Sequence, residues 1–384
     1  MKLIHLSDLH LGKTLNGFSL LEDQKYILQR IQEILDRERP DAVLISGDIY
    51  DRSAPSAEAV EACDGFLCGI ADRKIPLLII SGNHDSPERL SFGSRIMRSG
   101  GVYIAGTYSK AEEPVILRDS AGEVRFYLLP FFRPELIRHV YPEEPAQTYT
   151  EAVRTALGHW EIDTGVRNVL LVHQFVIGAE RSESEDITVG GTDEVDASVF
   201  EPFDYVALGH LHRAQKVGKE TVRYCGTPLK YSFSEASDQK SVTVVDLPEK
   251  GVCEIRTVPL YPLRDMREIR GTFDELTLRD NYAGTATDDY LKVYLTDEEE
   301  IPYAMELLRP IYPNIMVLRY DNTRARLEGF DGVSEDTERK SEMEMFEELY
   351  LKQNGLEMSE QQKAFASDLI DGIKREYADG GNGK

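Results

Sequence analysis

The segment KLIHLSDLHLG (residues 2–12) sets the pattern of the chain, because a short apolar run passes directly into a polar motif. DAVLISGD (residues 41–48) and PLLIISGNHD (residues 76–85) repeat this arrangement. Three amphipathic segments follow these runs, near residues 20–38, 56–73 and 87–98. Strands that alternate with helices are typical of a sheet covered by helices, so we expect an α/β fold.

From residue 102 to about residue 260 the predicted strands follow one another more closely, and predicted helices become fewer. The β-like runs are VYIAG, PVILR, VRFYLLP, NVLLVH, DYVALG, TVRYCG and SVTVVDL. Together with the first half they fit an α/β sandwich of two sheets flanked by helices. We expect residues 1–260 to form one domain.

Two smaller regions are expected after residue 260. DDYLKVYLT, EEEIPYAMELLRPIYP and NIMVLRYDN read as strand, helix and strand, so residues 261–330 are predicted to form a small α/β domain. Residues 331–384 combine a polar linker with two candidate helices, SEMEMFEELYLKQNG and SEQQKAFASDLIDGIKREY. The apolar stripe Met345, Phe346 and Leu349 indicates either ordinary packing or a face that binds a partner.

Composition limits the classes of function. The 384 residues carry a formal net charge of −24, and residues 331–384 contribute 14 acidic and 7 basic side chains to it. A protein that binds nucleic acid unaided is expected to show a basic surface, which this balance disfavours. Bound cations would invert the local potential at a site, and a partner would have to supply further basic surface.

The sequence favours a cytoplasmic protein. No apolar run approaches the length of about 18 residues that a membrane span needs, and the N-terminal residues do not resemble a signal peptide. The four cysteines are scattered without the spacing of metal ligands, and a reducing compartment would keep them as thiols.

Five polar motifs follow apolar, strand-like runs. They are Asp8-Leu9-His10, Gly47-Asp48, Gly82-Asn83-His84-Asp85, Val172-His173 and Gly209-His210-Leu211-His212. Ligands of α/β sheets bind at the carboxyl ends of strands, so we expect the five motifs to converge on one site. Any one of these histidines alone would more often be structural, whereas five motifs in order predict a functional site. His5, His139 and His159 match no motif and are expected to be structural.

The motif residues match the ligands that two divalent ions require, which are oxygens, imidazoles and one bridging carboxylate. We assign Asp8, His10 and His212 to the first ion. Asn83, His173 and His210 are assigned to the second ion, and Asp48 bridges the two. Two such metal ions hold both the attacking and the leaving oxygen of an in-line displacement. The ligand set therefore predicts metal-assisted phosphoester hydrolysis.

His84 and Asp85 have no place in that ligand set, and we expect them to be catalytic. A histidine oriented by an aspartate suits transition-state stabilisation or protonation of the leaving oxygen. Arg52 either contacts a phosphate or pairs with Asp51 structurally, and the sequence does not separate these alternatives.

The motif order over residues 8–212 resembles the calcineurin-like metallophosphoesterase superfamily. LSDLHLG, VHQFV, ERSESE and YCGTPLKYSFSE resemble more narrowly its double-strand-break repair nucleases. That resemblance implies a nuclease that uses two Mn²⁺ ions, with Mg²⁺ as the alternative, degrades double-stranded DNA ends from 3′ to 5′ and cuts hairpins. It also implies a homodimer within a heterotetramer, whose coiled-coil ATPase docks on the C-terminal helices. Residues 261–330 would then cap the nuclease domain and position DNA.

One motif departs from the archaeal and eukaryotic relatives, which carry a histidine shortly after Gly-Asp. Here the sequence continues Ile49-Tyr50-Asp51-Arg52, so the role of that histidine is not transferred. A phosphatase or cyclic-nucleotide phosphodiesterase on the same two ions is the alternative enzyme, because ligands do not encode the leaving group. A scaffold that has lost its metals is disfavoured, because all seven expected ligands are present.

Overall fold

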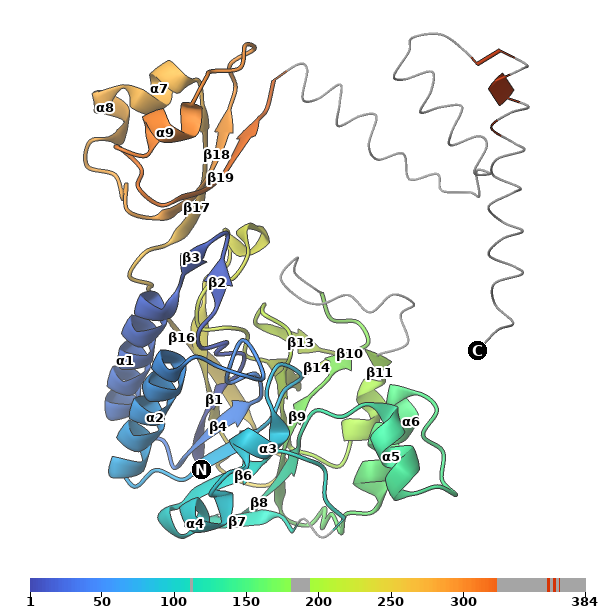
Figure 1. Cartoon of the computed structure of the whole chain (residues 1–384). Coiled ribbons are helices and arrows are strands. Elements are labelled where there is room, and N and C mark those ends of the chain that lie inside the picture. Colours follow the sequence, from blue (N-terminus) through green and yellow to red (C-terminus); the bar gives the residue numbers. More distant parts are fainter. Residues whose placement is uncertain (111–112, 181–193, 323–357, 360–361, 364–365, 367–384) are drawn as a thin grey trace. The chain divides into compact units, whose positions relative to one another are not determined.

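The computed structural model describes residues 1–110, 113–180, 194–322, 358–359, 362–363 and 366. The two predicted C-terminal helices, with Met345, Phe346 and Leu349, therefore lie almost wholly outside the described residues, as does most of the ERSESE run. The chain divides into two compact units, Met1–Tyr320 and Asp321–Lys384. The first unit contains the two sheets of the sandwich (Figure 1).

The first sheet is built on the N-terminal apolar runs. Its strands, in spatial order, are β16 (Glu254–Pro259), β15 (Ser241–Asp246), β1 (Lys2–Leu6), β4 (Ala42–Ser46), β5 (Leu77–Ile80) and β6 (Val102–Ala105). The four strands from β1 to β6 run parallel, while β15 pairs antiparallel with both β1 and β16. Helices α1 (Leu21–Glu38) and α2 (Ala57–Asp72) form as the sequence predicts.

The second sheet has a similar plan. Its strands, in spatial order, are β13 (Gln215–Val217), β14 (Lys219–Tyr224), β12 (Tyr205–Gly209), β9 (Arg167–His173), β8 (Gly122–Leu129) and β7 (Val115–Asp119). The central strands from β14 to β8 run parallel, and the two edge strands pair antiparallel. Two helices accompany this sheet, α5 (Pro134–Val140) and α6 (Tyr149–Gly158).

Alternation along the strands explains the sandwich. On β1, Ile4 packs with the α1 and α2 side chains, whereas its neighbour Leu3 packs in a separate cluster with residues of β8, β9 and β12. Successive side chains of a strand point to opposite faces, so one apolar run serves both layers. A third cluster packs α5 and α6 against the outer face of the second sheet. The predicted two-sheet α/β fold is confirmed.

The predicted helix near residues 87–98 is wrong as a single element. The structure breaks it into α3 (Pro87–Leu90), α4 (Ser94–Met97) and a 3₁₀ turn at Arg98–Gly100. Gly93 lies between them with φ of 74°, a left-handed conformation that ends a helix and that glycine adopts without steric penalty. Short strand pairs also connect the main elements, β2 (Thr14–Leu15) with β3 (Phe18–Ser19) and β10 (Phe175–Val176) with β11 (Glu194–Val195).

A third, parallel sheet follows residue 260. Its strands are β17 (Met266–Gly271), β18 (Tyr290–Leu295) and β19 (Ile315–Tyr320), and its short helices are α7 (Phe273–Thr277), α8 (Arg279–Tyr282) and α9 (Ala304–Leu308). The expected strand, helix and strand are present as β18, α9 and β19. The helix is shorter than the sequence suggested, and Tyr303 in a left-handed conformation precedes it. The sequence did not reveal β17, α7 or α8.

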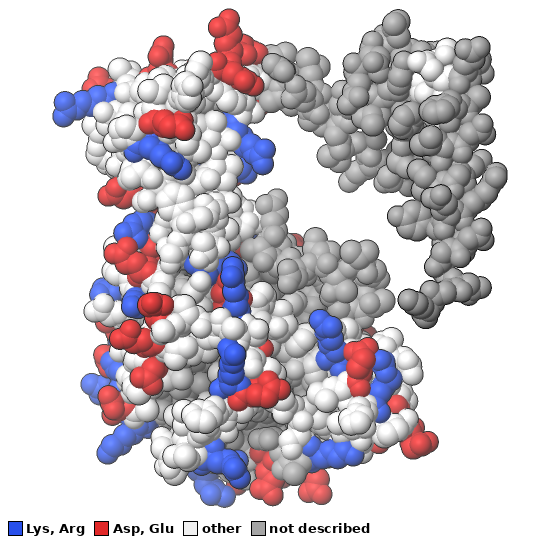
Figure 2. All heavy atoms as spheres, in the orientation of Figure 1, with Lys and Arg blue, Asp and Glu red and all other residues white. Residues whose placement is uncertain are grey.

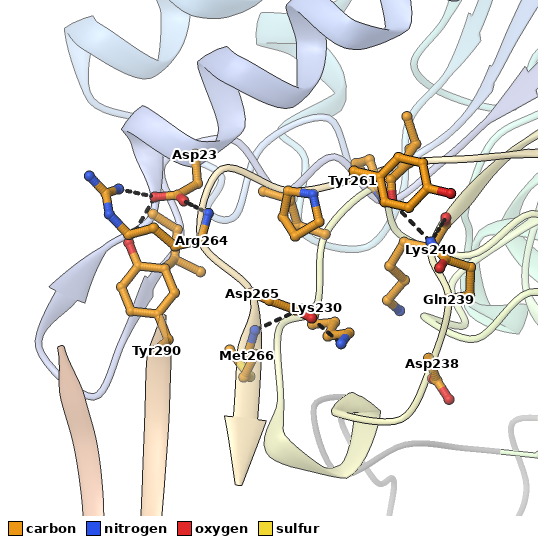
Figure 3. Close-up of a pocket in the computed structure, with 15 residues that line it drawn as sticks. Asp23, Lys230, Asp238, Gln239, Lys240, Tyr261, Arg264, Asp265, Met266 and Tyr290 are labelled. Carbon is orange, nitrogen blue, oxygen red and sulfur yellow. Dashed lines mark hydrogen bonds and ion pairs between the residues drawn. The ribbon is translucent and has the colours of Figure 1, made fainter. Parts of the chain in front are cut away.

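A buried aspartate of α1 joins the two sequence regions. Asp23 accepts hydrogen bonds from the Arg264 guanidinium at 2.8 Å and from the Tyr290 hydroxyl at 2.7 Å (Figure 3). The small cavity drawn there, about 80 Å³, is lined by none of the predicted site residues. Residues 1–320 thus pack as one compact unit, and the domain boundaries at residues 260 and 330 stay predictions.

None of the helices in the described part of the chain combines the length and apolarity that crossing a membrane requires.

Candidate metal centre

The loops after β1 and β4 lie directly against each other. The Asp8 amide donates to the Gly47 carbonyl at 3.0 Å, and the His10 amide donates to the Asp48 carbonyl at 3.0 Å. Asp8, His10 and Asp48 have φ of 53°, 44° and 49°. Left-handed backbone is strained for such residues and is concentrated at functional sites, where the surrounding structure enforces it.

Glycines let these loops approach. A Cβ atom on Gly82 would lie 2.0 Å from Asp48 Oδ1, and one on Gly209 would lie 1.8 Å from the Ser46 carbonyl oxygen. Both distances are shorter than any real contact, so no other residue fits at either position without displacing the loops. These two glycines therefore allow a close approach of the backbones.

One group of side chains contains Asp8, His10 and His212, whose candidate ligand atoms lie within 4.8 Å of one another. The Nε2 atoms of His10 and His212 are 3.2 Å apart, and all three side chains are buried. Burial lowers the pKa of His10 well below its usual value, so its imidazole is neutral and can offer a lone pair. The His10 Nδ1 atom is buried without a hydrogen-bond partner.

A second group contains Asn83, His173 and His210. Asn83 Oδ1 lies 3.0 Å from His173 Nε2 and 3.0 Å from His210 Nδ1. His173 Nδ1 lies 2.8 Å from the Ser46 carbonyl oxygen, which can only accept, so Nδ1 carries a proton. When the ring is neutral, Nε2 then presents its lone pair toward the oxygen of Asn83.

Asp48 lies between the two groups. Its Oδ2 atom is 3.4 Å from His173 Nε2 and 3.7 Å from His10 Nε2. Burial alone would lower the pKa of His173, but the Asp48 carboxylate raises it to about 9. Burial raises the pKa of Asp8 to about 6, and the charge of Asp48 contributes to the rise. Buried carboxylates and lone pairs that face one another favour positive charge, so this donor set fits divalent cations.

His84 borders the same space. Its Nδ1 atom is 3.0 Å from the Asp51 carbonyl oxygen, its Nε2 atom is 4.0 Å from Asp48 Oδ2, and its side chain is 29% exposed. Its backbone amide donates to Asp48 Oδ1 at 2.9 Å. The structure thus brings His84 to the edge of the centre with its Nδ1 already held by the backbone.

The sequence suggested that Asp85 orients the His84 ring, but its carboxylate bonds elsewhere. Its buried carboxylate accepts hydrogen bonds from the backbone amides of Gly82, Ile49 and Tyr50, at 2.9, 3.2 and 3.0 Å. The oxygen that orients the His84 ring belongs to the Asp51 backbone instead. Asp85 therefore ties the loop after β5 to the loop after β4, and its catalytic role stays a prediction.

The two alternatives for Arg52 stay open. The Arg52 side chain is 78% exposed, and its Nε atom is 3.8 Å from Asp51 Oδ2, which is too long for a hydrogen bond. Asp51 instead pairs with Lys13, whose Nζ donates to Oδ1 at 2.8 Å. Arg52 is therefore only loosely paired and accessible to solvent.

Sequence reasoning missed the side chains that support the loops. Gln24 donates to the His10 carbonyl at 2.7 Å, and the Tyr231 hydroxyl donates to the Leu9 carbonyl at 2.6 Å. Glu235 is fully buried, and its Oε1 atom lies 3.5 Å from His212 Nδ1. Burial alone would raise the pKa of Glu235, but His212 and Lys240 lower it to about 2, so it is ionised at neutral pH. Tyr231 and Glu235 do fall within the YCGTPLKYSFSE motif, which was the available signal.

The three histidines that match no motif lie outside the centre. His5 Nδ1 is 2.8 Å from the Tyr205 hydroxyl, and the His159 ring stacks on Tyr141 while its Nε2 lies 2.7 Å from Glu144. The third, His139, is exposed on α5. All four cysteines are free thiols.

Comparisons with known proteins agree with this geometry. The calcineurin-like phosphoesterase family matches residues 1–214, and the type 5 capsule protein repressor C-terminal domain family matches residues 262–354. SbcD of the SbcCD nuclease from Staphylococcus epidermidis is 35% identical over 83% of this chain and 85% of its own length. SbcD of Staphylococcus saprophyticus is 34% identical over 83% of this chain and 84% of its own length.

Among solved structures, a dimetal phosphatase from Danio rerio aligns with 68% of this chain and 99% of its own at 11% identity, with a TM-score of 0.37. That likeness is too weak to bear on function. The family matches and the two Staphylococcus relatives are sufficient: the chain belongs to the SbcD family of calcineurin-like phosphoesterases, and it is a hydrolase of phosphoester bonds.

Proposed function

We propose that this chain is a two-metal DNA nuclease that degrades double-stranded ends from 3′ to 5′ and cuts hairpins, together with an SbcC-type coiled-coil ATPase. The observation that carries the proposal is that His173 Nε2 lies 3.0 Å from Asn83 Oδ1 and 3.4 Å from Asp48 Oδ2. The raised pKa of His173 indicates that positive charge is favoured among these atoms, and a shared divalent cation would supply it in place of a proton. The names of the relatives support the choice of DNA as substrate.

Each ion has its own side chains in this proposal. Asp8, His10 and His212 hold the first ion, Asn83, His173 and His210 hold the second, and Asp48 is shared. Mn²⁺ is the favoured metal because the resemblance to the double-strand-break repair nucleases implies it, and Mg²⁺ is the alternative. When bound, the two ions supply an activated water near neutral pH and positive charge beside the attacked phosphate.

His84 acts on the leaving oxygen. The Asp51 carbonyl fixes its ring with Nε2 toward the centre, and its partial exposure lets that nitrogen reach a bound phosphate. There it donates a proton, or a hydrogen bond, to the oxygen that leaves. Asp85 keeps the two loops in register without touching the substrate, so its effect on the reaction is indirect.

A partner is proposed to supply basic surface for DNA. On the face drawn in Figure 2, Lys and Arg side chains are interspersed with Asp and Glu and form no continuous basic stripe among the described residues. Together with the net charge of −24, this supports DNA binding in a complex rather than by the chain alone. We assign ATPase docking to residues 331–384 and DNA positioning to residues 261–330.

The chain is proposed to form a homodimer within a heterotetramer. Phe92 and Ile96, on the segment that follows the Gly82-Asn83-His84-Asp85 motif, have exposed fractions of 83% and 80%, and Met97 beside them is 42% exposed. Large apolar side chains gathered on a surface are typical of protein interfaces. A second copy of the chain would cover them next to the catalytic loops.

The experiment compares three substrates with and without the ATPase partner. The purified chain is incubated with Mn²⁺ on blunt duplex DNA, on hairpin DNA and on a generic phosphodiester such as bis(p-nitrophenyl) phosphate. A nuclease acting in a complex should cleave both DNA substrates faster when the ATPase and ATP are present. A cyclic nucleotide is added as a fourth substrate. A chain that hydrolyses only the small ester or the cyclic nucleotide would instead be a small-molecule phosphodiesterase.

A further inference from the structure

The two groups of the centre fix their histidines by different means. His173 donates its Nδ1–H to a main-chain oxygen, that of Ser46. His212 faces a side chain instead, because Glu235 Oε1 lies 3.5 Å from its Nδ1 atom while its Nε2 atom faces His10. A carboxylate behind one ring nitrogen, with the other nitrogen turned to the site, is the usual arrangement for a histidine that binds a metal.

Lys240 completes the support of His212. Its Nζ atom is 2.5 Å from Glu235 Oε2 and 2.8 Å from the His212 carbonyl oxygen. Glu235 and Lys240 are 0% and 7% exposed. One buried ion pair thus contacts both the ring and the main chain of His212.

Stability alone does not explain this pair. Removing two charges from water costs several kcal/mol per ion, and apolar residues of similar volume often stabilise such a position equally well. Glu235 is the last residue of the 3₁₀ turn Phe233–Glu235, which the Ser232 side chain caps by accepting from the Ser234 amide, without Lys240. What the charges add is a fixed acceptor behind the His212 ring.

We propose that Glu235, held by Lys240, is a positioning residue for His212. It accepts the Nδ1–H of the ring, fixes the tautomer whose Nε2 lone pair faces Asp8 and His10, and raises the affinity of this half of the centre for a divalent ion. The inference rests on the proposed two-metal function. It goes beyond that function in assigning one ion's affinity to residues that touch neither metal nor DNA.

The test removes the Glu235 carboxylate and the Lys240 ammonium group together, so that neither is left as an unpaired buried charge. The apolar variant combines Glu235→Met with Lys240→Met. The amide variant combines Glu235→Gln with Lys240→Met and retains an oxygen that can still accept from His212. The matched control is Asp119→Asn with Arg167→Met, an ion pair with a 2.6 Å contact at the end of β9 opposite His173.

Calorimetric titration of the metal-stripped full chain with MnCl₂ is the first readout. The apolar variant should bind one ion as the wild type does and the other about 10- to 100-fold more weakly, the range for loss of such a support. The amide variant should lose less, and the control should lower the melting temperature with both affinities unchanged. The second readout is the ¹⁵N chemical shift of His212 in the metal-stripped wild type, which should report protonation at Nδ1.

The outcomes separate the two proposals. A wild type that binds two ions, with a folded apolar variant of equal affinity for both, would overturn the role of Glu235 alone. A His212 ring protonated at Nε2 in the wild type would also overturn the role of Glu235. This readout applies even if the apolar variant does not fold. A wild type that binds no manganese would overturn the proposed function, and this inference with it.

Discussion

The two halves of the centre are held in place by different groups. One half contains Asn83, His173 and His210, and the other contains Asp8, His10 and His212. In the first, a main-chain carbonyl orients the ring of His173. In the second, the side chains of Gln24, Tyr231 and Glu235 support the loop or the ring.

The difference matters because a main-chain acceptor is the same whatever residue occupies that position. A side-chain support, in contrast, is lost by a single substitution. We therefore expect the His212 half to be open to tuning by residues outside the centre, while the ring of His173 depends mainly on the packing of the strand ends.

Asp48 is shared by both halves, so its removal should have the largest effect. Asp48→Ala should lower DNA cleavage by about 10³-fold or more, because several kcal/mol of transition-state stabilisation depend on the paired ions. Cleavage of duplex DNA and manganese stoichiometry are measured together, with the exposed Asp72→Ala as control. Full activity with two bound ions would show that Asp48 does not bridge the halves.

His84 lies outside both halves and should separate catalysis from metal binding. His84→Gln should reduce cleavage by about 10²- to 10⁴-fold, the usual contribution of a positioned acid. Its backbone amide, which binds Asp48, is unchanged, so both ions should remain in a calorimetric titration. Loss of an ion in this variant, but not in the exposed His139→Gln control, would place His84 among the ligands instead.

Asp85 ties the loop that carries Asn83 to the loop that carries the shared Asp48, and its replacement should act on folding and on both ions. Asp85→Asn substitutes an amide for a carboxylate that accepts from three backbone amides. Leaving such donors unsatisfied costs about 1 to 3 kcal/mol, which urea unfolding would measure as a lower midpoint. Weakening of both manganese affinities is expected, and an effect on cleavage with unchanged stability and affinity would instead favour a catalytic role.

The Tyr231 hydroxyl supports the His10 loop, while the Tyr231 ring contacts those of His10 and His212. Removing the hydroxyl alone should therefore have the smallest effect. Tyr231→Phe removes the hydrogen bond to Leu9 and should lower the free energy of unfolding by about 1 kcal/mol. It should weaken the ion of the His212 half a few-fold, by roughly the same energy or less. Tyr312→Phe is the matched control, because its hydroxyl bonds to Leu276 away from the centre. Equal weakening of both ions by Tyr231→Phe would remove the distinction between the halves.

The sequence predicts which candidate ligands come together, because each of them ends an apolar strand or lies within four residues after one. The convergence of Asp8, Asp48 and His173 follows from the rule that strand ends meet at one edge of a sheet. The break at Gly93 was harder to foresee, since a glycine within an amphipathic pattern is often tolerated in a helix. Local spacing carries no information about which conformation such a glycine adopts.

The supporting residues could not be predicted for a different reason. Glu235 and His212 meet through tertiary packing, and nothing in the spacing of these two residues predicts contact. Asp85 adjoins His84 in sequence, yet its carboxylate turns to the amides of Ile49 and Gly82 because the loops need those donors satisfied. Adjacency along the chain thus suggested a pair that the packing of the loops does not form.

Electron paramagnetic resonance of the full chain loaded with two equivalents of Mn²⁺ tests most directly whether the halves form one centre. Ions bridged by Asp48 lie close enough to couple, so the wild type should give the spectrum of an exchange-coupled pair. Asp48→Ala should give the spectrum of isolated ions. A wild type that shows only the six-line signal of isolated manganese would contradict a shared two-metal centre.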